Sequence, residues 1–183
     1  LDHPEFKDHD TSSLRSIGYG GSVMPEELIR RLLEAWPGLK IYNVYGLTEA
    51  GTGGTYLDAA DAVTKLGSIG VPWDSGQEAR IVNDEGIDVS IHEVGEIILR
   101  GPNVMKGYYK MEAETAEAVR EGWFYTGDIG HIDEDGYLVI TDRKKDIIVT
   151  AGGKNVAPQP IENSLKTDPY IEGAVLVGDK RRF

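Results

Sequence analysis

Apolar positions in the first part of the chain alternate between the spacing of a strand and that of a helix. Residues 14–19 predict a short strand that runs into Gly20-Gly21. Residues 25–36 place apolar side chains at helical spacing, with a proline in the first turn and Pro37-Gly38 at the end. Residues 40–46 predict a second strand. This order of strand, helix and strand is typical of an α/β layer.

The pattern changes after about residue 67 to short strands separated by turn residues. Between the two regions, residues 46–56 are rich in glycine and threonine, and we expect them to form a long loop. The later pattern predicts two strands, a short helix and a β-hairpin, at 77–82, 95–101, 112–122 and 129–141. The predicted fold is therefore mixed α/β, with an α/β layer followed by an antiparallel β-subdomain.

A run of charged residues follows the hairpin, and we place a domain boundary there. A larger domain would cover residues 1–141, and residues 142–183 would hold a hinge and the first part of a smaller α+β domain. That second part begins with the charged run, a short strand at 147–149, a glycine-containing loop and a proline-rich helix start. An ordinary surface connection would also account for the charges.

The composition excludes several classes of function. Acidic residues outnumber basic ones by 31 to 19, and the net charge of −12 disfavours a nucleic-acid surface. The chain has no cysteine, which excludes disulfides, thiolate catalysis and zinc–thiolate sites. The four histidines show no metal-ligand spacing, and no apolar run reaches the roughly 20 residues of a membrane helix.

The stretch "YGLTEAGTGG", residues 45–54, contains the first group of candidate chemical residues. The hydroxyl of Thr48 suits a phosphate oxygen, and the carboxylate of Glu49 suits Mg²⁺, a hard cation that prefers oxygen ligands. Tyr45 offers a flat face for a purine. A flexible loop with a buried tyrosine is the plainer interpretation of the same residues.

Two further stretches suit a nucleotide. Asp128, in "FYTGD", could accept hydrogen bonds from two ribose hydroxyls, although the stretch alone is only a turn. Arg143 follows 15 residues later across the hairpin, so we expect the two side chains to lie close together. The glycines of "GGSV", residues 20–23, permit close approach to the backbone at a strand end.

Five motifs in a fixed order resemble those of the adenylate-forming enzymes, which comprise acyl-CoA synthetases, luciferases and peptide-synthetase adenylation domains. They are "GYGGSVMPEE", "YGLTEAG", "GEIILRGPNVMKGYYK", "GWFYTGD" and "DRKKDIIVTAGGKNVAPQPIE". The resemblance spans nearly the whole chain. The last motif, with "VLVGDKRRF" after it, looks most like the long-chain fatty acyl-CoA synthetases.

The resemblance implies a fatty acid–CoA ligase that uses ATP, magnesium and CoA. A carboxylate attacks the α-phosphate of ATP to give an acyl-adenylate, and CoA then displaces AMP. Thr48 and Glu49 would be catalytic, with Thr48 at the α-phosphate and Glu49 binding magnesium. The nucleotide-binding residues implied are Gly20, Gly21 and Ser22 at the edge of adenine, Tyr45 stacked on it, Gly46, Asp128 at the ribose, Ile140 and Arg143.

The resemblance also implies a hinge at Asp142, kept in solvent by the charged run around it. After a rotation about this hinge, the loop with Gly152, Gly153 and Lys154 would help to form the CoA tunnel. We expect the chain to be a fragment of a cytoplasmic parent, inactive alone because the phosphate loop and a catalytic lysine lie outside it. Peripheral membrane association and the oligomeric state of the parent stay open.

Two alternatives remain open at this point. An acyl-carrier-protein ligase or adenylation domain would use protein-bound phosphopantetheine in place of CoA. A non-catalytic nucleotide-binding module would be complete as it stands, and the sequence of the parent gene would distinguish it from a ligase.

Overall fold

A computed structural model describes residues 1–22, 24–150, 152, 155–166, 168 and 170–178, apart from the side chain of Thr52. The fold is mixed α/β, as predicted. A nine-stranded sheet runs in the order β1-β2-β3-β4-β9-β8-β6-β5, and β7 pairs with β8. Its strands are β1 (Ser16–Gly20), β2 (Lys40–Leu47), β3 (Gly51–Leu57), β4 (Ser68–Pro72), β5 (Glu78–Val82), β6 (Gly95–Arg100), β7 (Val119–Arg120), β8 (Trp123–Ile132) and β9 (Leu138–Arg143).

The remaining elements are short. A two-stranded sheet pairs β10 (Ile148–Val149) with β11 (Asn155–Val156). The helices are α1 (Glu26–Ala35), α2 (Glu112–Ala118) and α3 (Pro158–Leu165), and the 3-10 turns are η1 (Phe6–Asp8), η2 (Thr48–Ala50) and η3 (Lys144–Asp146). No helix in the described parts of the chain is long and apolar enough to cross a membrane.

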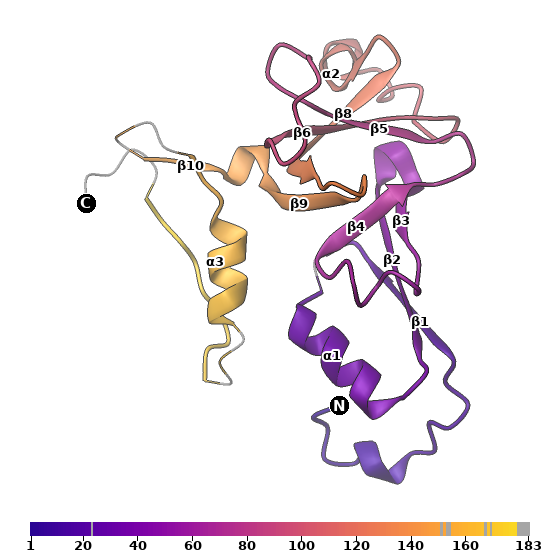
Figure 1. The fold of residues 1–183 in the computed structure, drawn as a ribbon. Coiled ribbons are helices and arrows are strands. Elements are labelled where there is room, and N and C mark those ends of the chain that lie inside the picture. The colour runs from indigo at the N-terminus through magenta and orange to yellow at the C-terminus, as the bar shows by residue number, and fades with distance from the viewer. Residues whose placement is uncertain (23, 151, 153–154, 167, 169, 179–183) are drawn as a thin grey trace.

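The α/β layer forms where the hydrophobic pattern predicts it. Strands β1 and β2 pair in parallel, and α1 connects them and packs along the layer (Figure 1). Ile29 of α1 is buried against Leu39 and Ile41 in the first of two hydrophobic clusters. Parallel strands require such a crossover, since their adjacent ends lie at opposite sides of the sheet. Both strands therefore end at one edge of the layer.

The predicted loop at 46–56 is wrong, because most of it is strand β3. This strand pairs antiparallel with both β2 and β4. Thr55 and Leu57 are fully buried, and Tyr56 between them is only partly buried, which is the alternation of a strand. Only Gly51 among the glycines of this stretch has a positive φ, 67°, where η2 turns into the strand. Pairing on both sides outweighs the low strand propensity of glycine.

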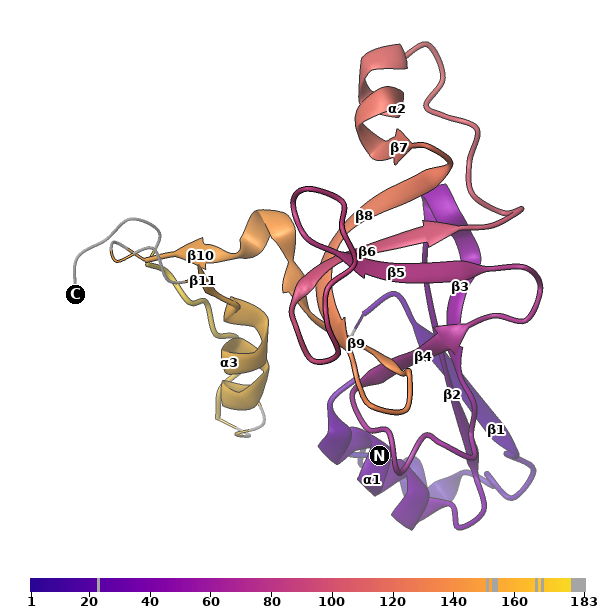
Figure 2. The same cartoon turned by 45° about the horizontal axis from the view of Figure 1, so that its top comes forward.

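The antiparallel β-subdomain agrees with the prediction except in one helix. Strands β5, β6, β8 and β9 lie over one end of the α/β layer (Figure 2), and a second cluster fills the space between them. The helix expected at 112–122 ends at Ala118 instead. Glu121 and Gly122 both have positive φ, 51° and 82°, and they turn the chain sharply so that β7 pairs with β8.

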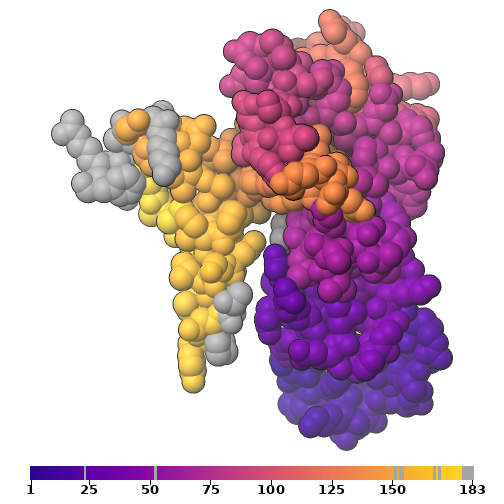
Figure 3. Space-filling model, viewed as in Figure 1, coloured from indigo at the N-terminus to yellow at the C-terminus, as the bar shows by residue number. Residues whose placement is uncertain are grey.

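The C-terminal part forms a separate lobe. In the space-filling view it adjoins the rest of the molecule near the end of β9 and stands away from α1 (Figure 3). Helix α3 contacts β9. The predicted boundary at residues 141 and 142 falls inside β9, which continues to Arg143 before η3 and β10 begin.

Candidate functional site

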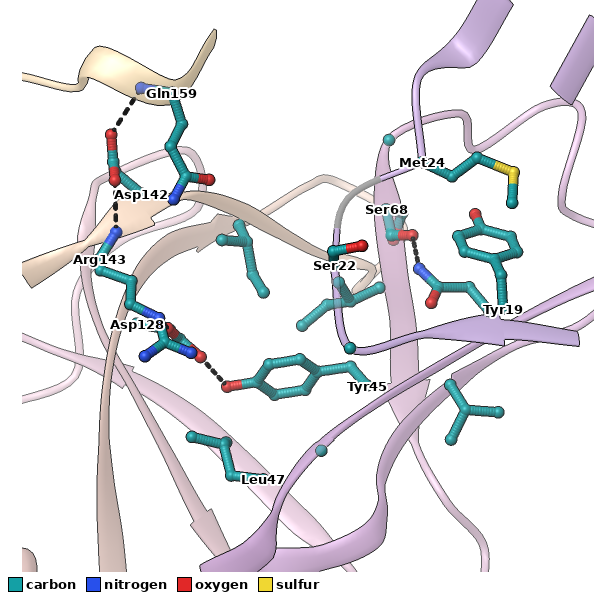
Figure 4. Close-up of a pocket in the computed structure, with 17 residues that line it drawn as sticks. Tyr19, Ser22, Met24, Tyr45, Leu47, Ser68, Asp128, Asp142, Arg143 and Gln159 are labelled. Atoms are coloured by element: carbon teal, nitrogen blue, oxygen red, sulfur yellow. Dashed lines mark hydrogen bonds and ion pairs between the residues drawn. The ribbon is translucent and has the colours of Figure 1, made fainter. Parts of the chain in front are cut away.

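A pocket of about 280 Å³ lies where β1 and β2 end, facing β9 and the start of α3 (Figure 4). Open α/β sheets place ligand sites outside the carboxyl ends of their parallel strands. All of the predicted nucleotide-binding residues except Gly20 line it, together with the predicted hinge residue: Gly21, Ser22, Tyr45, Gly46, Asp128, Ile140, Arg143 and Asp142, with the last as the hinge. The structure therefore gathers most of the predicted site from separate stretches of sequence.

One carboxylate organises the centre of the pocket. The Tyr45 hydroxyl donates a hydrogen bond to Asp128 Oδ2 at 2.6 Å, and Arg143 Nε lies 3.3 Å from Oδ1. Asp128 and Arg143 are direct partners in the β8–β9 register, so the expected proximity is confirmed. Asp128 is only 4% exposed. Its fixed position and open oxygen lone pairs suit it to accept hydrogen bonds from a ligand's hydroxyl groups.

Burial changes the pKa of both Asp128 and Tyr45. It raises the pKa of Asp128, while hydrogen bonding from the Tyr45 hydroxyl and the charge of the Arg143 guanidinium lower it. Burial also raises the pKa of Tyr45, and the neighbouring Asp128 charge adds to this effect. Tyr45 therefore stays a hydrogen-bond donor. The exposed guanidinium of Arg143 leaves positive charge at the mouth of the pocket.

Asn43 also lines the pocket, although it was not among the residues predicted from the sequence. Its side-chain amide donates a hydrogen bond to the Ser68 carbonyl at 3.0 Å, and this bond orients the amide along the pocket wall. A signal was present, because Ile41, Asn43 and Tyr45 occupy the buried positions of β2. A polar side chain at an inward position of such an alternation needs a partner or a ligand.

Asp142 is buried, contrary to the expectation that the hinge residue lies in solvent. It is 0% exposed, and its carboxylate accepts hydrogen bonds from the backbone N–H groups of Arg143 at 2.7 Å and Gln159 at 3.0 Å. Backbone donors make burial of a carboxylate tolerable. Residues 143–146 are exposed, so only the first residue of the charged run is packed.

Gln159, the second residue of α3, also lines the pocket, and no sequence signal marks it. The Asp142 carboxylate satisfies one of the free N–H groups at this helix start, as an N-cap side chain would. The contact joins the C-terminal lobe to the end of β9 beside the pocket (Figure 4). It depends on how α3 docks, which local sequence patterns do not encode.

Some predicted residues lie elsewhere. Gly20 lies within β1, and a Cβ at this position would overlap the Val44 carbonyl, so its lack of a side chain serves strand packing. Thr48 is exposed in η2. Gly152 is an exposed turn residue. Gly153 and Lys154 lie outside the described residues.

Glu49, the predicted magnesium ligand, also lies outside the pocket lining and accepts a hydrogen bond from the Tyr108 hydroxyl at 2.9 Å. Among the residues that the structure describes, no group of three or more histidine or acidic side chains could hold a metal. A single carboxylate does not form a protein-only metal site. It does fit Mg²⁺, which commonly takes one or two carboxylates and completes its shell with water and substrate phosphates.

Comparison with known families identifies the fold. The model for "AMP-binding enzyme" matches residues 1–109, which is more than half of the chain, and the model for "AMP-binding enzyme C-terminal domain" matches residues 145–183. The chain belongs to the AMP-binding enzyme family. This membership confirms the resemblance to adenylate-forming enzymes.

Relatives within the AMP-binding enzymes are named for different acids. The chain is 42% identical to a feruloyl-CoA synthase of Amycolatopsis sp, over 96% of its own length and 35% of the relative's. It is 41% identical to a long-chain-fatty-acid–CoA ligase of Bacillus subtilis, over 97% of its length and 31% of the relative's. The chain thus spans about a third of the length of these curated relatives.

Solved AMP-binding enzymes share the arrangement of elements. The O-succinylbenzoate coenzyme A synthetase MenE of Bacillus subtilis, in complex with AMP, aligns with a TM-score of 0.84 at 33% identity. That alignment covers 93% of this chain and 34% of MenE. The amide bond synthetase McbA of Marinactinospora thermotolerans aligns with a TM-score of 0.83 at 32% identity, over 96% of this chain and 35% of McbA.

Proposed function

We propose that this chain is the nucleotide-binding part of an AMP-forming acid–CoA ligase. The parent protein would activate a carboxylic acid with ATP, release pyrophosphate and transfer the acyl group from the adenylate to CoA. The observation that carries the proposal is the buried Asp128 carboxylate, held by Tyr45 and Arg143 at the ends of parallel strands. The relatives named for CoA ligation of several acids support the reaction class.

The nucleoside half of the ligand would fill the pocket. In this placement Asp128 accepts hydrogen bonds from the two ribose hydroxyls, and Arg143 lies beside the ribose and the α-phosphate. The backbone of Gly21 and Ser22 approaches the edge of adenine, while Asn43 offers it a side-chain amide. The pocket's volume, about 280 Å³, is near the lower end of the range for small-ligand sites and suits a nucleoside.

The triphosphate would extend from the pocket toward η2. Thr48 would donate to the α-phosphate, and Glu49 would hold Mg²⁺ that arrives with the phosphates. Such an ion neutralises charge on phosphate oxygens and on the leaving pyrophosphate. The protein's part is to hold Glu49 and Thr48 in fixed positions on one turn, because electrostatic stabilisation requires groups that do not reorganise.

The second half-reaction would involve the C-terminal lobe. We propose that residues 1–141 and 142–183 are two domains, that Asp142 is the hinge, and that the loop with Gly152, Gly153 and Lys154 approaches CoA. The Asp142–Gln159 hydrogen bond supports this proposal, since it joins the lobe to β9 through a contact that a rotation could release.

The proposed acid is a long-chain fatty acid, and a carrier-protein thiol is the alternative acceptor. The last sequence motif and the match to the Bacillus subtilis long-chain ligase favour the fatty acid. Ferulic, indoleacetic and succinylbenzoic acids are the natural competitors to test, because relatives of similar identity are named for them.

Pyrophosphate exchange into ATP by the full-length protein, measured with each acid in turn, tests the proposal. We expect exchange that requires one acid, Mg²⁺ and an intact Asp128, followed by thioester formation when CoA is added. Thioester formed on a carrier protein but not on CoA would favour the alternative acceptor. Absence of exchange with every acid, in a protein that is folded, would refute ligase activity.

A further inference from the structure

One segment of the chain holds the turn that carries Thr48 and Glu49. Residues 103–108 donate three hydrogen bonds to it: Asn103 Nδ2 to the Ala50 carbonyl at 2.6 Å, Met105 N to the Glu49 carbonyl at 2.7 Å, and Tyr108 Oη to Glu49 Oε1 at 2.9 Å. The first two bonds fix the backbone of the turn. Only the third acts on the Glu49 carboxylate, so Tyr108 alone among them sets its direction.

Tyr108 is itself held in place. Its backbone N–H donates to Thr115 Oγ1 at 2.9 Å, and that hydroxyl donates to the Met111 carbonyl at 2.6 Å. Thr115 also packs where a side chain at position 107 would lie, so only glycine fits there. The connection from α2 through Thr115 therefore fixes the backbone of Tyr108, from which the phenol hydroxyl reaches Glu49.

The phenol hydroxyl of Tyr108 donates its hydrogen bond to one oxygen of the Glu49 carboxylate, Oε1. Tyr108 uses one oxygen of Glu49, and no hydrogen bond within the described part of the chain involves the other carboxylate oxygen, Oε2, which can therefore face a cation. A carboxylate held in this way presents one oxygen in a fixed direction.

We propose that Tyr108 is a positioning residue that orients Glu49 toward the Mg²⁺ carried by the nucleotide. The inference rests on the proposed role of Glu49 in the adenylation step. Groups that orient a metal-binding side chain typically change metal affinity or activity by roughly 10–100-fold when they are removed. Loss of the phenol hydroxyl should therefore raise the Mg²⁺ requirement by about tenfold.

The chain offers a matched control in the next residue. Tyr109 is 85% exposed, so Tyr109→Phe removes the same hydroxyl without touching Glu49. Tyr108→Phe keeps the aromatic ring and its packing, and it removes only the donor. A general loss of stability would lower the rate at every Mg²⁺ concentration, whereas a positioning role shifts the Mg²⁺ dependence itself.

The contact can be tested without activity, on the 183-residue chain labelled with ¹³Cζ-tyrosine. Tyr108→Phe and Tyr109→Phe each remove one resonance and so assign both. We expect Glu49→Gln to shift the Tyr108 resonance, because the charged acceptor becomes neutral, and to leave the Tyr109 resonance in place. An unchanged Tyr108 resonance would overturn the proposal at the level of the contact.

The role is tested in the full-length protein by pyrophosphate exchange against Mg²⁺ concentration at saturating ATP. Tyr108→Phe should need about tenfold more Mg²⁺ for half-maximal rate, with an unchanged KM for the acid, while Tyr109→Phe should match the native protein. An unchanged Mg²⁺ requirement in Tyr108→Phe overturns the proposal, whatever the maximal rate. If Glu49→Gln itself leaves exchange unaffected, the proposed function of Glu49 fails first, and the two failures are thereby distinguished.

Discussion

Replacing Asp142 with alanine should detach α3 from β9. The carboxylate of this fully buried residue accepts backbone hydrogen bonds from Arg143 and Gln159. Hydrogen bonds to a charged group contribute about 1.5–3 kcal/mol each, and losing an N-cap acceptor removes about 0.5–2 kcal/mol. The N–H of Arg143 lies beside an exposed segment and can bind water instead, and removal of a buried charge relieves its desolvation. We therefore expect a net loss of about 2 kcal/mol in the docking of α3.

Hydrogen–deuterium exchange on the 183-residue chain measures this loss where it occurs. A change of about 2 kcal/mol corresponds to roughly 30-fold faster opening of the amides in α3, with little change in β2 or β6. Asp142→Asn keeps the shape and one acceptor oxygen, so it should give a smaller effect. Asp146→Ala removes an exposed carboxylate of the same charged run and serves as the control. Equal exchange in Asp142→Ala and Asp146→Ala would refute the reasoning.

Three further changes give distinct results. Asp142→Pro in the full-length protein should fix the backbone at this position and leave one half-reaction measurable, whereas equal loss of both in a folded protein would contradict the hinge assignment. Gly70→Ala should unfold much of the sheet, because the new Cβ would overlap the Tyr56 backbone. Gly136 has a similar positive φ but open space around it, so Gly136→Ala should lower the free energy of unfolding, measured by chemical denaturation, by only about 1 kcal/mol. Asp128→Asn should have a higher melting temperature than the native chain at pH 7. Because burial raises the pKa of Asp128, the stability of the native chain falls as pH rises from the unfolded pKa of about 3.9 through the raised value. Below about pH 4 the native carboxyl is protonated, and the difference in melting temperature between the variant and the native chain should vanish.

The sequence was most informative where local pattern and pairing agree. Helix α1 and strand β2 follow directly from their apolar spacing, and the hairpin of β8 and β9 predicts the proximity of Asp128 and Arg143. Strand β3 was missed because its glycines favour a loop locally, whereas its pairing with β2 and β4 is a property of the assembled sheet.

In the candidate site, too, some residues could be predicted from the local sequence and others could not. Its motif residues could be named from sequence, because five motifs in a fixed order resemble those of the adenylate-forming enzymes. Asn43 could have been found from the burial pattern of β2. The burial of Asp142 and its contact with Gln159 could not, because a charged run normally lies in solvent and the docking of α3 is a tertiary contact.

The most direct test of the account is a calorimetric titration of the 183-residue chain with AMP and with 2′,3′-dideoxy-AMP. If Asp128 holds the ribose hydroxyls, AMP should bind. We expect a dissociation constant weaker than about 0.1 mM, because the pocket offers few charge-assisted hydrogen bonds and each contributes only about 1.5–3 kcal/mol. The dideoxy nucleotide should bind at least about tenfold more weakly, and Asp128→Asn, which should be folded and stable, should remove the difference between them. Equal binding of the two nucleotides to the native chain would contradict the assignment of this pocket as the nucleotide site.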